Sequence, residues 1–377
     1  MAWSTAHRWL ENLSRPLRRL VSAYALLLAL FALLRLLRVS GIPLLDLANT
    51  FAPYLFMPLV ITFPLPILVM RATAEQPGEV ARKRLSSPRK AAPATGSRHA
   101  PHWSGLLQLA LIVIGLYWFA LPALYKTVAP PQGETFRVIT FNVQGSNRDL
   151  GQAMDWLLGQ AADIILLQET AEGYDSRLAP LYAAYAHEDH VEDGHARVFS
   201  RYAIMQSEVI VLEDEPGRWA LRLLLDQDGR ELAVYALHLT LPLSPREKNT
   251  IEEDIGLEAL LRYDEARRNA QIRRLLTLLK AESVPTIVAG DFNMSDTSLI
   301  YAELAGQLRD AWRGAGAGAG RTWPLAEAIG WPRIIRPLLR IDYIWHSDSL
   351  RPTNAAVGAP IGSDHLPLLA EFEWIDG

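Results

Sequence analysis

Three long apolar stretches in the first third of the chain constrain its fold more than any other feature. They cover residues 20–37, 51–70 and 106–125. Each is close to the roughly 20 residues that an α-helix needs to cross a bilayer. The second stretch contains four prolines, so we expect an irregular helix there. The sequence therefore predicts a membrane region with about three transmembrane helices in residues 1–127, followed by a separate domain in 128–377.

Charge divides the chain at the same place. Residues 1–127 carry 14 Lys and Arg against 4 Asp and Glu, a net charge of +10, whereas residues 128–377 carry 23 against 37, a net charge of −14. Seven of the basic residues lie in 71–103 and four precede the first apolar stretch. The positive-inside rule places such segments in the cytosol. We therefore expect a multi-pass protein of the cell membrane, with a basic cytosolic loop at 71–103 and an extracytoplasmic catalytic domain.

Two other interpretations of the first 127 residues are less favoured. A cleaved signal peptide would need a site of small residues after the apolar stretch, and none of the three stretches is followed by a convincing one. The basic 71–103 segment would alternatively bind nucleic acid. The association of positive charge with apolar stretches favours the membrane interpretation.

The rest of the chain alternates short β-like runs with amphipathic helices. Helices are predicted at 149–159 and 258–281. Strands are predicted at 136–143, 163–167, 197–200, 204–212, 219–225, 232–239, 285–289, 341–345 and 368–374. Many strands with few long helices favour an α/β fold of packed sheets flanked by helices. The chain has no cysteine, which excludes disulfides and thiolate metal sites.

Acidic, amide and imidazole side chains recur where the predicted strands begin or end. They are Asn142, Glu169, His238, Asp291, Asn293, Asp342, Asp364 and His365. Carboxylates with amide oxygens suit a hard cation such as Mg²⁺, with Mn²⁺ as a substitute. Any one of these residues is explained by solvation or by a turn. Their joint order along the chain is what indicates a site for hydrolysis of phosphate esters.

That order resembles the endonuclease/exonuclease/phosphatase superfamily. This Mg²⁺-dependent group includes deoxyribonuclease-type nucleases, abasic-site endonucleases, inositol-polyphosphate phosphatases and neutral sphingomyelinases. The resemblance covers about residues 135–375 and rests on five ordered motifs: Asn142, Gln168-Glu169, Gly290–Asn293, Arg340–Ile344 and Ser363–His365. It implies a four-layer α/β sandwich of two packed mixed sheets flanked by helices.

The resemblance also implies a metal site. Glu169 would be the principal Mg²⁺ ligand, with Asn142 and Asp364 nearby. Gln144 stands where several nucleases of the family carry an acid, so the resemblance leaves open whether one metal or two would bind.

Roles in the reaction follow from the same resemblance. Asp291 would position or deprotonate the attacking water, and Asn293 would hold a phosphate oxygen. His365, oriented by Asp342, would act on the phosphate, and His238 would stabilise charge on the pentacoordinate state or the leaving group. The substrate-binding residues would then be Asn142, Asn293 and His238. Phosphoryl transfer depends mostly on positioning and on neutralisation of negative charge, which such a set supplies.

Five further polar residues stay ambiguous at the level of sequence. His187 and His190 suggest a metal site, but their acidic surroundings favour a solvated loop, and His195 is similar. Arg268 and Gln271 begin a pattern on the long predicted helix that resembles a family feature, whereas a helix-surface ion pair explains Arg268 equally well.

The substrate is inferred from charge and location. Proteins that bind duplex nucleic acid usually present a basic surface, whereas the predicted catalytic domain is acidic. We therefore expect a lipid-linked phosphate ester at the outer membrane face, with an extracytoplasmic nuclease as the alternative and a non-catalytic binding module as the second alternative. The Trp323–Arg340 segment, with two Trp and several Arg, would contact acyl chains and head groups, or its aromatics would pack between the sheets.

Overall fold

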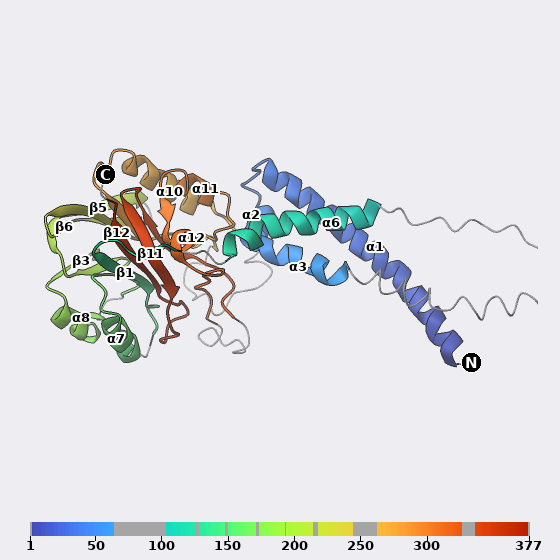
Figure 1. Cartoon of the computed structure of the whole chain (residues 1–377), viewed down its shortest axis with the longest axis horizontal. Helices are drawn as coiled ribbons and strands as arrows, with labels where there is room; N and C mark the ends of the chain where they lie inside the picture. Colours follow the sequence, from blue (N-terminus) through green and yellow to red (C-terminus); the bar gives the residue numbers. More distant parts are fainter. Residues whose placement is uncertain are drawn as a thin grey trace, which may run out of the picture. The chain divides into compact units, whose positions relative to one another are not determined.

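The structure is a computed structural model that describes residues 2–63, 103–124, 128–147, 150–170, 173–192, 194–213, 218–243, 262–325 and 336–375. The chain forms two compact units, shown in Figure 1. The first contains Met1–Val39 and Ala52–Pro122, and the second contains Ser40–Phe51 and Ala123–Gly377. The second unit therefore includes a short segment from within the predicted membrane region.

The described part of the first unit is helical. Its helices are α1 (Ala2–Leu36), α3 (Ala52–Thr62) and α6 (Trp103–Gly115), which continues through a π-helical turn over Leu116–Ala120. Within the described residues, the Arg19–Leu36 part of α1 is long and apolar enough to cross a membrane.

The second and third transmembrane helices stay predictions. α3 and the preceding α2 (Pro43–Thr50) qualify as a span only when taken together, and they are bent by 69° at their junction. The apolar helix at Ser104–Ala120 is shorter than a typical span. Residues 64–102, which hold most of the predicted basic loop, lie outside the described residues.

The second unit contains two six-stranded mixed sheets. Sheet A has the order β11-β12-β1-β2-β4-β3, and sheet B has the order β5-β6-β7-β8-β10-β9. In sheet A the strands are β1 (Thr135–Asn142), β2 (Ile164–Gln168), β3 (His187–His190), β4 (Arg197–Ser200), β11 (Leu350–Val357) and β12 (Leu368–Trp374). In sheet B they are β5 (Ala203–Glu213), β6 (Arg218–Gln227), β7 (Arg230–His238), β8 (Thr286–Asp291), β9 (Arg309–Asp310) and β10 (Asp342–His346). β1 pairs with β2, and β7 with β8, in parallel.

The sheets pack face to face, and helices cover their outer faces (Figure 1). α7 (Leu150–Gly159) and α8 (Ala179–Ala184) pack on sheet A, and α10 (Ala266–Leu279) and α11 (Tyr301–Leu304) pack on sheet B. The unit also contains the one-turn helix α12 (Ala311–Ala315) and a 3₁₀ turn at Asp175–Arg177. The four-layer α/β sandwich expected from the sequence is confirmed.

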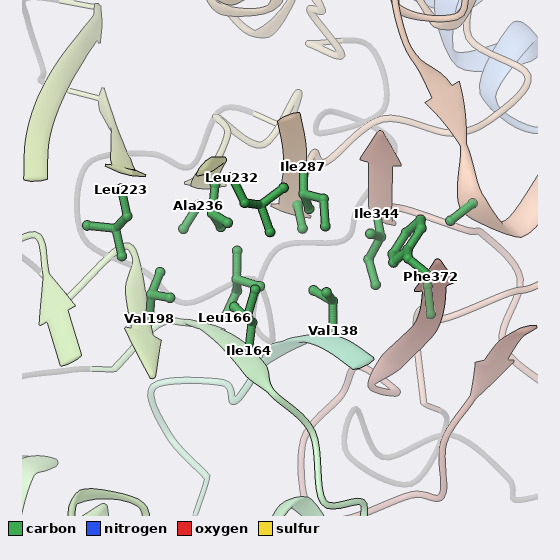
Figure 2. Packing of buried hydrophobic residues seen from close by; sticks show 14 of the residues in the cluster. Val138, Ile164, Leu166, Val198, Leu223, Leu232, Ala236, Ile287, Ile344 and Phe372 are labelled. Carbon is green, nitrogen blue, oxygen red and sulfur yellow. The ribbon is translucent and has the colours of Figure 1, made fainter. Parts of the chain in front are cut away.

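The core between the sheets follows from the alternation of side chains along each strand. Phe136 and Val138 of β1 point inward with Ile287 and Ala289 of β8, as Figure 2 shows for several members of this cluster. The intervening residues, such as Ile139, point outward onto a helix. Burial of these apolar faces stabilises the sandwich by about 25 cal/mol per Å² removed from water.

The nine predicted strands are all present, with ends within two residues of the prediction. The interpretation of His187 and His190 as a solvated loop is wrong, because they begin and end β3, an edge strand hydrogen-bonded to β4. The long predicted helix begins at Ala266 rather than 258: residues 258–261 lie outside the described residues, and Tyr263 forms a β-bridge to Leu243.

Candidate active site

Three strands of sheet B bring His238, Asp291 and Asp342 side by side. In the strand register Asp291 is opposite His238 of β7 on one side and Asp342 of β10 on the other. Each of the three residues lies two positions along its strand from an apolar residue that faces the other sheet. Because side chains alternate between the two faces of a strand, these three side chains also point into the space between the sheets. The row lies at the rim because His238 and Asp291 end their strands and Asp342 begins its own.

Gly290 allows this row to form. Its φ is +149°, in a region that side chains avoid, and a Cβ there would overlap the carbonyl oxygen of Leu237 on the neighbouring strand. The glycine of the Gly-Asp-Phe-Asn motif is therefore required by the close approach of β7 to β8.

Asn142 joins the two sheets across the site. It is buried at the end of β1, and its Nδ2 donates to Glu169 Oε1 at 2.9 Å and to Asp291 Oδ2 at 3.1 Å. Its Oδ1 accepts from the backbone N–H of Gln144 at 2.9 Å. The bond from the Gln144 N–H fixes the orientation of the Asn142 amide. If the amide were flipped, its NH₂ group would face the N–H of Gln144, and both groups are donors. Asn142 thus presents donors, and no oxygen, to the two carboxylates.

Glu169 follows β2 in a left-handed conformation with φ of +58°. Its side chain is 36% exposed, and Oε2 accepts from the backbone N–H of Gly145 at 3.0 Å. Burial acts to raise the pKa of this carboxyl, but the neighbouring His238 imidazole and the hydrogen bonds from Asn142 and Gly145 outweigh burial and lower it. Glu169 is therefore a charged, accessible carboxylate at the rim.

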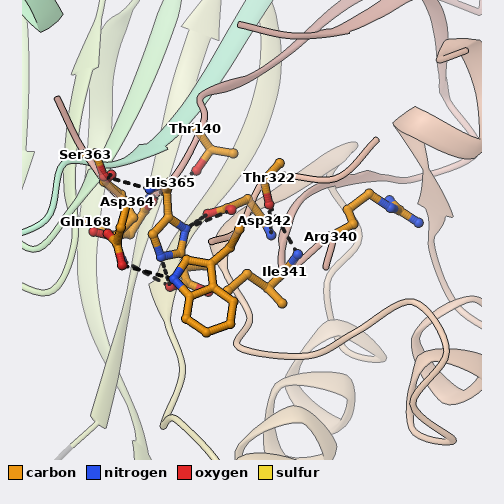
Figure 3. A network of polar contacts seen from close by, with 12 residues as sticks. Thr140, Gln168, Thr322, Arg340, Ile341, Asp342, Ser363, Asp364 and His365 are labelled. Atoms are coloured by element: carbon orange, nitrogen blue, oxygen red, sulfur yellow. Dashed lines mark hydrogen bonds and ion pairs between the residues drawn. The ribbon is translucent and has the colours of Figure 1, made fainter. Parts of the chain in front are cut away.

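His365 and Asp342 form a buried pair, shown in Figure 3. His365 Nδ1 lies 3.0 Å from Asp342 Oδ2, which leaves Nε2 facing Asp291 Oδ2 at 3.7 Å. Burial opposes the charge on the imidazole, but Asp342, Asp364 and Asp291 together hold the pKa of His365 well above its usual value. Ser363 Oγ accepts from the His365 backbone N–H and donates to the Asn142 carbonyl oxygen at 2.7 Å, which fixes the loop to β1.

Asp291 and His238 have pKa values shifted in opposite directions. Burial, reinforced by the negative charge of Asp342, raises the pKa of Asp291 to about 7, although the charge of His365 opposes it. Burial lowers the pKa of His238 to about 4. His238 Nε2 lies 3.6 Å from Asp291 Oδ2 and 3.8 Å from Glu169 Oε1. A neutral imidazole is thus held beside a carboxyl that titrates near neutrality.

Asn293 is held from three sides. Its backbone N–H donates to Asp291 Oδ1 at 2.8 Å, and its Nδ2 donates to the carbonyl oxygen of Leu239 at 2.9 Å. Its own carbonyl oxygen accepts from Arg268 Nη1 at 2.7 Å. These bonds maintain a φ of +47°, a conformation that costs energy in a residue with a side chain.

Arg268 and Gln271 of α10 support the loops of the site from behind. Arg268 is buried and pairs with Glu265 at 2.8 Å, so it does not form the surface ion pair that one sequence interpretation offered. Gln271 is also buried, and its Oε1 accepts from the backbone N–H of Thr240, two residues after His238.

Three residues at the site were not assigned to it from the sequence. Trp323 Nε1 donates to Asp364 Oδ2 at 3.0 Å, and its ring centroid lies 6.4 Å from that of His365. His195 is not an isolated loop residue, because its ring centroid lies 5.6 Å from that of His238. Arg218, at the start of β6, reaches His195 Nε2 at 2.5 Å. The Trp and Arg residues of the Trp323–Arg340 segment suggested that this segment lies near the site. Nothing in the sequence around Arg218 indicated that this residue would reach it.

The sequence matches a known family over most of the second unit. Residues 139–365 match the Endonuclease/Exonuclease/phosphatase family. The chain belongs to this family. Its members are metal-dependent phosphoester hydrolases such as nucleases and phosphatases, so the protein is a metal-dependent hydrolase of phosphate esters.

Solved structures with this fold include several members of the family. An endonuclease/exonuclease/phosphatase from Bacteroides vulgatus is 19% identical with a TM-score of 0.51, over 64% of this chain and 100% of that one. A TDP2 from D. rerio, humanized by 14 mutations, is 20% identical with a TM-score of 0.49, over 63% and 99%. A mannosyl-6-phosphatase from Bacteroides thetaiotaomicron is 18% identical with a TM-score of 0.46, over 63% and 100%. No curated protein matches the chain.

A divalent cation fits the charges of the family site. Among the described residues, Asp291, Asp342 and His365 offer ligand atoms within 4.8 Å of one another. His365 Nδ1 is already hydrogen-bonded to Asp342. The pKa of His365 is raised, and a protonated imidazole is a poor metal ligand. Glu169 and Asp364 provide carboxylate oxygens at the same rim. Burial, reinforced by the negative charge of Asp342, raises the pKa of Asp291, and a cation nearby would favour its charged form.

Proposed function

We propose that this protein is a membrane-anchored, Mg²⁺-dependent phosphoesterase that hydrolyses a lipid-linked phosphate ester or phosphodiester outside the cytoplasm. The observation that carries the chemistry is the arrangement around Asp291 Oδ2. Asn142 Nδ2 lies 3.1 Å from this oxygen, His238 Nε2 3.6 Å and His365 Nε2 3.7 Å. One carboxylate oxygen thus faces three nitrogen groups that can exchange or donate protons.

Asp291 is the group suited to accept a proton from the attacking water. A general base works best when its pKa lies near the working pH, and burial places that of Asp291 at about 7. Asn142 and the Asn293 backbone orient the carboxylate through its two oxygens. Asn293 is positioned to hold a phosphate oxygen with its side-chain amide.

The two histidines have different electrostatic roles. His365, kept protonated by Asp342, neutralises negative charge that spreads over the phosphate oxygens in the transition state. His238 is neutral, so it acts through a hydrogen bond to the same oxygens or to the leaving group.

The metal-binding residues in this proposal are Glu169 and Asp364. Asn142 holds Glu169 in place through its donor groups rather than through its oxygen. Bound Mg²⁺ would polarise the phosphate and acidify water. The indole of Trp323 fixes one oxygen of Asp364 and leaves the other available.

Membrane attachment is supported by α1 and by the segment that follows it. The Arg19–Leu36 helix has the length and hydropathy of a span. The next residues, Ser40–Phe51, belong to the same compact unit as the catalytic strands, so both lie on one side of any membrane that α1 crosses. The basic N-terminal flank would then be cytosolic and the catalytic domain extracytoplasmic.

A lipid-linked substrate suits the charge of the catalytic domain. The net charge of −14 over residues 128–377 opposes binding to long nucleic acids, whereas a membrane-held substrate needs no electrostatic attraction to reach the enzyme. Trp323 supplies an apolar surface beside His365. Trp331 and Ile335, which we also predict to contact acyl chains, lie outside the described residues.

The test uses the full-length chain in lipid nanodiscs with Mg²⁺ or EDTA. The substrates are a phospholipid, a sphingomyelin, a polyprenyl pyrophosphate and plasmid DNA. Asp291→Ala should abolish turnover, and Asp348→Ala, at an exposed carboxylate that pairs with the exposed Arg309, should leave it unchanged. Nicking of DNA without lipid turnover would identify a tethered nuclease instead. Mg²⁺ binding without any hydrolysis would favour the binding-module alternative.

A further inference from the structure

A segment far from the catalytic motifs in sequence is built into the back of the active site. α2 (Pro43–Thr50) lies in the compact unit of the two sheets, and its Leu45, Asp46, Asn49 and Thr50 are buried. The segment is joined by one residue to α3, which belongs to the other unit. Its last residue, Thr50, makes the contacts that matter here.

The backbone of Thr50 binds the loop that follows the Gly-Asp-Phe-Asn motif. Its carbonyl oxygen accepts from Ser295 Oγ at 3.2 Å and from Thr297 Oγ1 at 3.0 Å. Both hydroxyls are buried, and they also contact each other at 2.8 Å. The loop of residues 293–298 therefore closes against a carbonyl group that belongs to the Ser40–Phe51 segment.

The side chain of Thr50 belongs to a second set of hydrogen bonds that reaches the same loop. Its Oγ1 lies 2.7 Å from the hydroxyl of Tyr263 and donates to Glu265 Oε1 at 3.3 Å. Glu265 also accepts from Tyr263 at 2.9 Å and from Ser298 at 3.3 Å. Three hydroxyl groups from three parts of the chain thus share one buried carboxylate.

Glu265 connects these hydrogen bonds to the active site through Arg268. Its Oε2 pairs with Arg268 Nη2 at 2.8 Å, and Arg268 Nη1 donates to the carbonyl oxygen of Asn293 at 2.7 Å. Arg268 and Glu265 are both buried, so the position of one guanidinium depends on the partners of the carboxylate that binds it. Asn293 in turn has a left-handed φ that its surroundings must maintain.

We propose that Thr50 is a positioning residue for Asn293, so that the Ser40–Phe51 segment is a working part of the catalytic domain. This inference rests on the proposed hydrolytic function. Without the Thr50 hydroxyl, the buried Tyr263 hydroxyl and the buried Glu265 carboxylate each lose a partner, and buried polar groups without partners are costly. The loop would then relax, and the amide of Asn293 would shift from the geometry that the transition state requires.

The experiment compares Thr50→Val with Thr50→Ser in the full-length chain in nanodiscs. Valine keeps the shape and the carbonyl but removes the hydroxyl, whereas serine keeps the hydroxyl. The matched control is Thr277→Val, at an exposed residue of α10 whose hydroxyl donates to the Arg273 carbonyl of its own helix. Hydrolysis of p-nitrophenyl phosphate and bis(p-nitrophenyl) phosphate is followed as a function of substrate and of Mg²⁺, together with the midpoint of thermal unfolding.

We expect Thr50→Val to lower kcat by about tenfold, equivalent to ~1.4 kcal/mol of transition-state stabilisation. KM and the Mg²⁺ concentration for half-maximal rate should change less than twofold, because Thr50 reaches Asn293 and not the metal-binding carboxylates. Thr50→Ser and Thr277→Val should keep the parental kcat. If Thr50→Val does not fold, Tyr263→Phe removes the partner hydroxyl from the same contact and should give the same loss of kcat.

An unchanged kcat in folded Thr50→Val, or an equal loss in Thr50→Ser, would overturn the inference. So would a loss that disappears when rates are expressed per folded molecule. Asp291→Ala separates this failure from that of the proposed function. If Asp291→Ala is inactive and Thr50→Val is fully active, only the positioning role fails, whereas an active Asp291→Ala refutes both.

Discussion

The pairing of Asp342 with His365 gives the sharpest prediction. Asp342→Asn keeps the shape of the side chain and removes its charge. The two groups are buried and 3.0 Å apart, and a charge pair at about 4 Å is worth about 4 kcal/mol at an effective dielectric constant of 20. Asp291 and Asp364 also support the imidazolium, so part of this energy is retained. We take about 3 kcal/mol as lost, which predicts a fall in kcat of roughly 100-fold.

The assay is a double-mutant cycle in the full-length protein. kcat is measured for Asp342→Asn, for His365→Ala and for the double variant, with thermal unfolding as a check on folding. If Asp342 acts only through His365, Asp342→Asn should change kcat by less than twofold in the His365→Ala background. A further 100-fold loss in that background would refute the reasoning, because Asp342 would then have a role of its own, such as metal binding.

Three further predictions concern the metal and the core. EDTA should abolish hydrolysis and added Mg²⁺ should restore it, as followed by phosphate release, and activity that survives EDTA would contradict a metal-dependent site. Gly290→Ala should prevent folding, measured by circular dichroism, because its Cβ would overlap the Leu237 carbonyl, whereas a folded variant would show that β7 and β8 can separate. Arg340→Ala should lower the free energy of unfolding by about 3–5 kcal/mol in denaturant titrations, since it leaves the buried Asp310, 2.7 Å from Arg340 Nη1, without its charge partner. A loss below about 1 kcal/mol would mean that water replaces the Arg340 guanidinium at Asp310 and would contradict the buried pairing.

Much of the site was predictable because it lies at the ends of regular strands. The sequence placed His238, Asp291 and Asp342 at strand ends, and the structure shows that their two-residue spacing from inward-facing apolar residues puts them on the inner face. The ordered motifs then identified the family, which the match over residues 139–365 confirms. Three of the described strands were not predicted, and each has a weak pattern: β11 contains Pro352 and Asn354 around a bulge, β3 consists of polar residues at a sheet edge, and β9 has only two residues.

Residues that act through long-range contacts could not be predicted. Arg218 and His195 reach the site from segments without motifs. The pattern of Trp and Arg residues marked the Trp323 segment, but it did not predict that the indole would bind Asp364. The orientation of the Asn142 amide depends on the Gln144 backbone N–H, and the pKa of Asp291 depends on burial and on Asp342. Such properties arise only when separate segments exclude water together.

The sequence by itself determined the division into an apolar basic part and an acidic α/β domain, the sandwich fold, the family and the residues with the chemistry for phosphate-ester hydrolysis. These are encoded in local composition, in periodicity and in short motifs. Only the tertiary structure decided that Thr50, within the predicted membrane region, belongs to the catalytic unit and contacts Glu265 and the loop after Asn293. The reason is physical: those hydrogen bonds join residues more than 200 positions apart, and they exist only once the whole unit has folded around them.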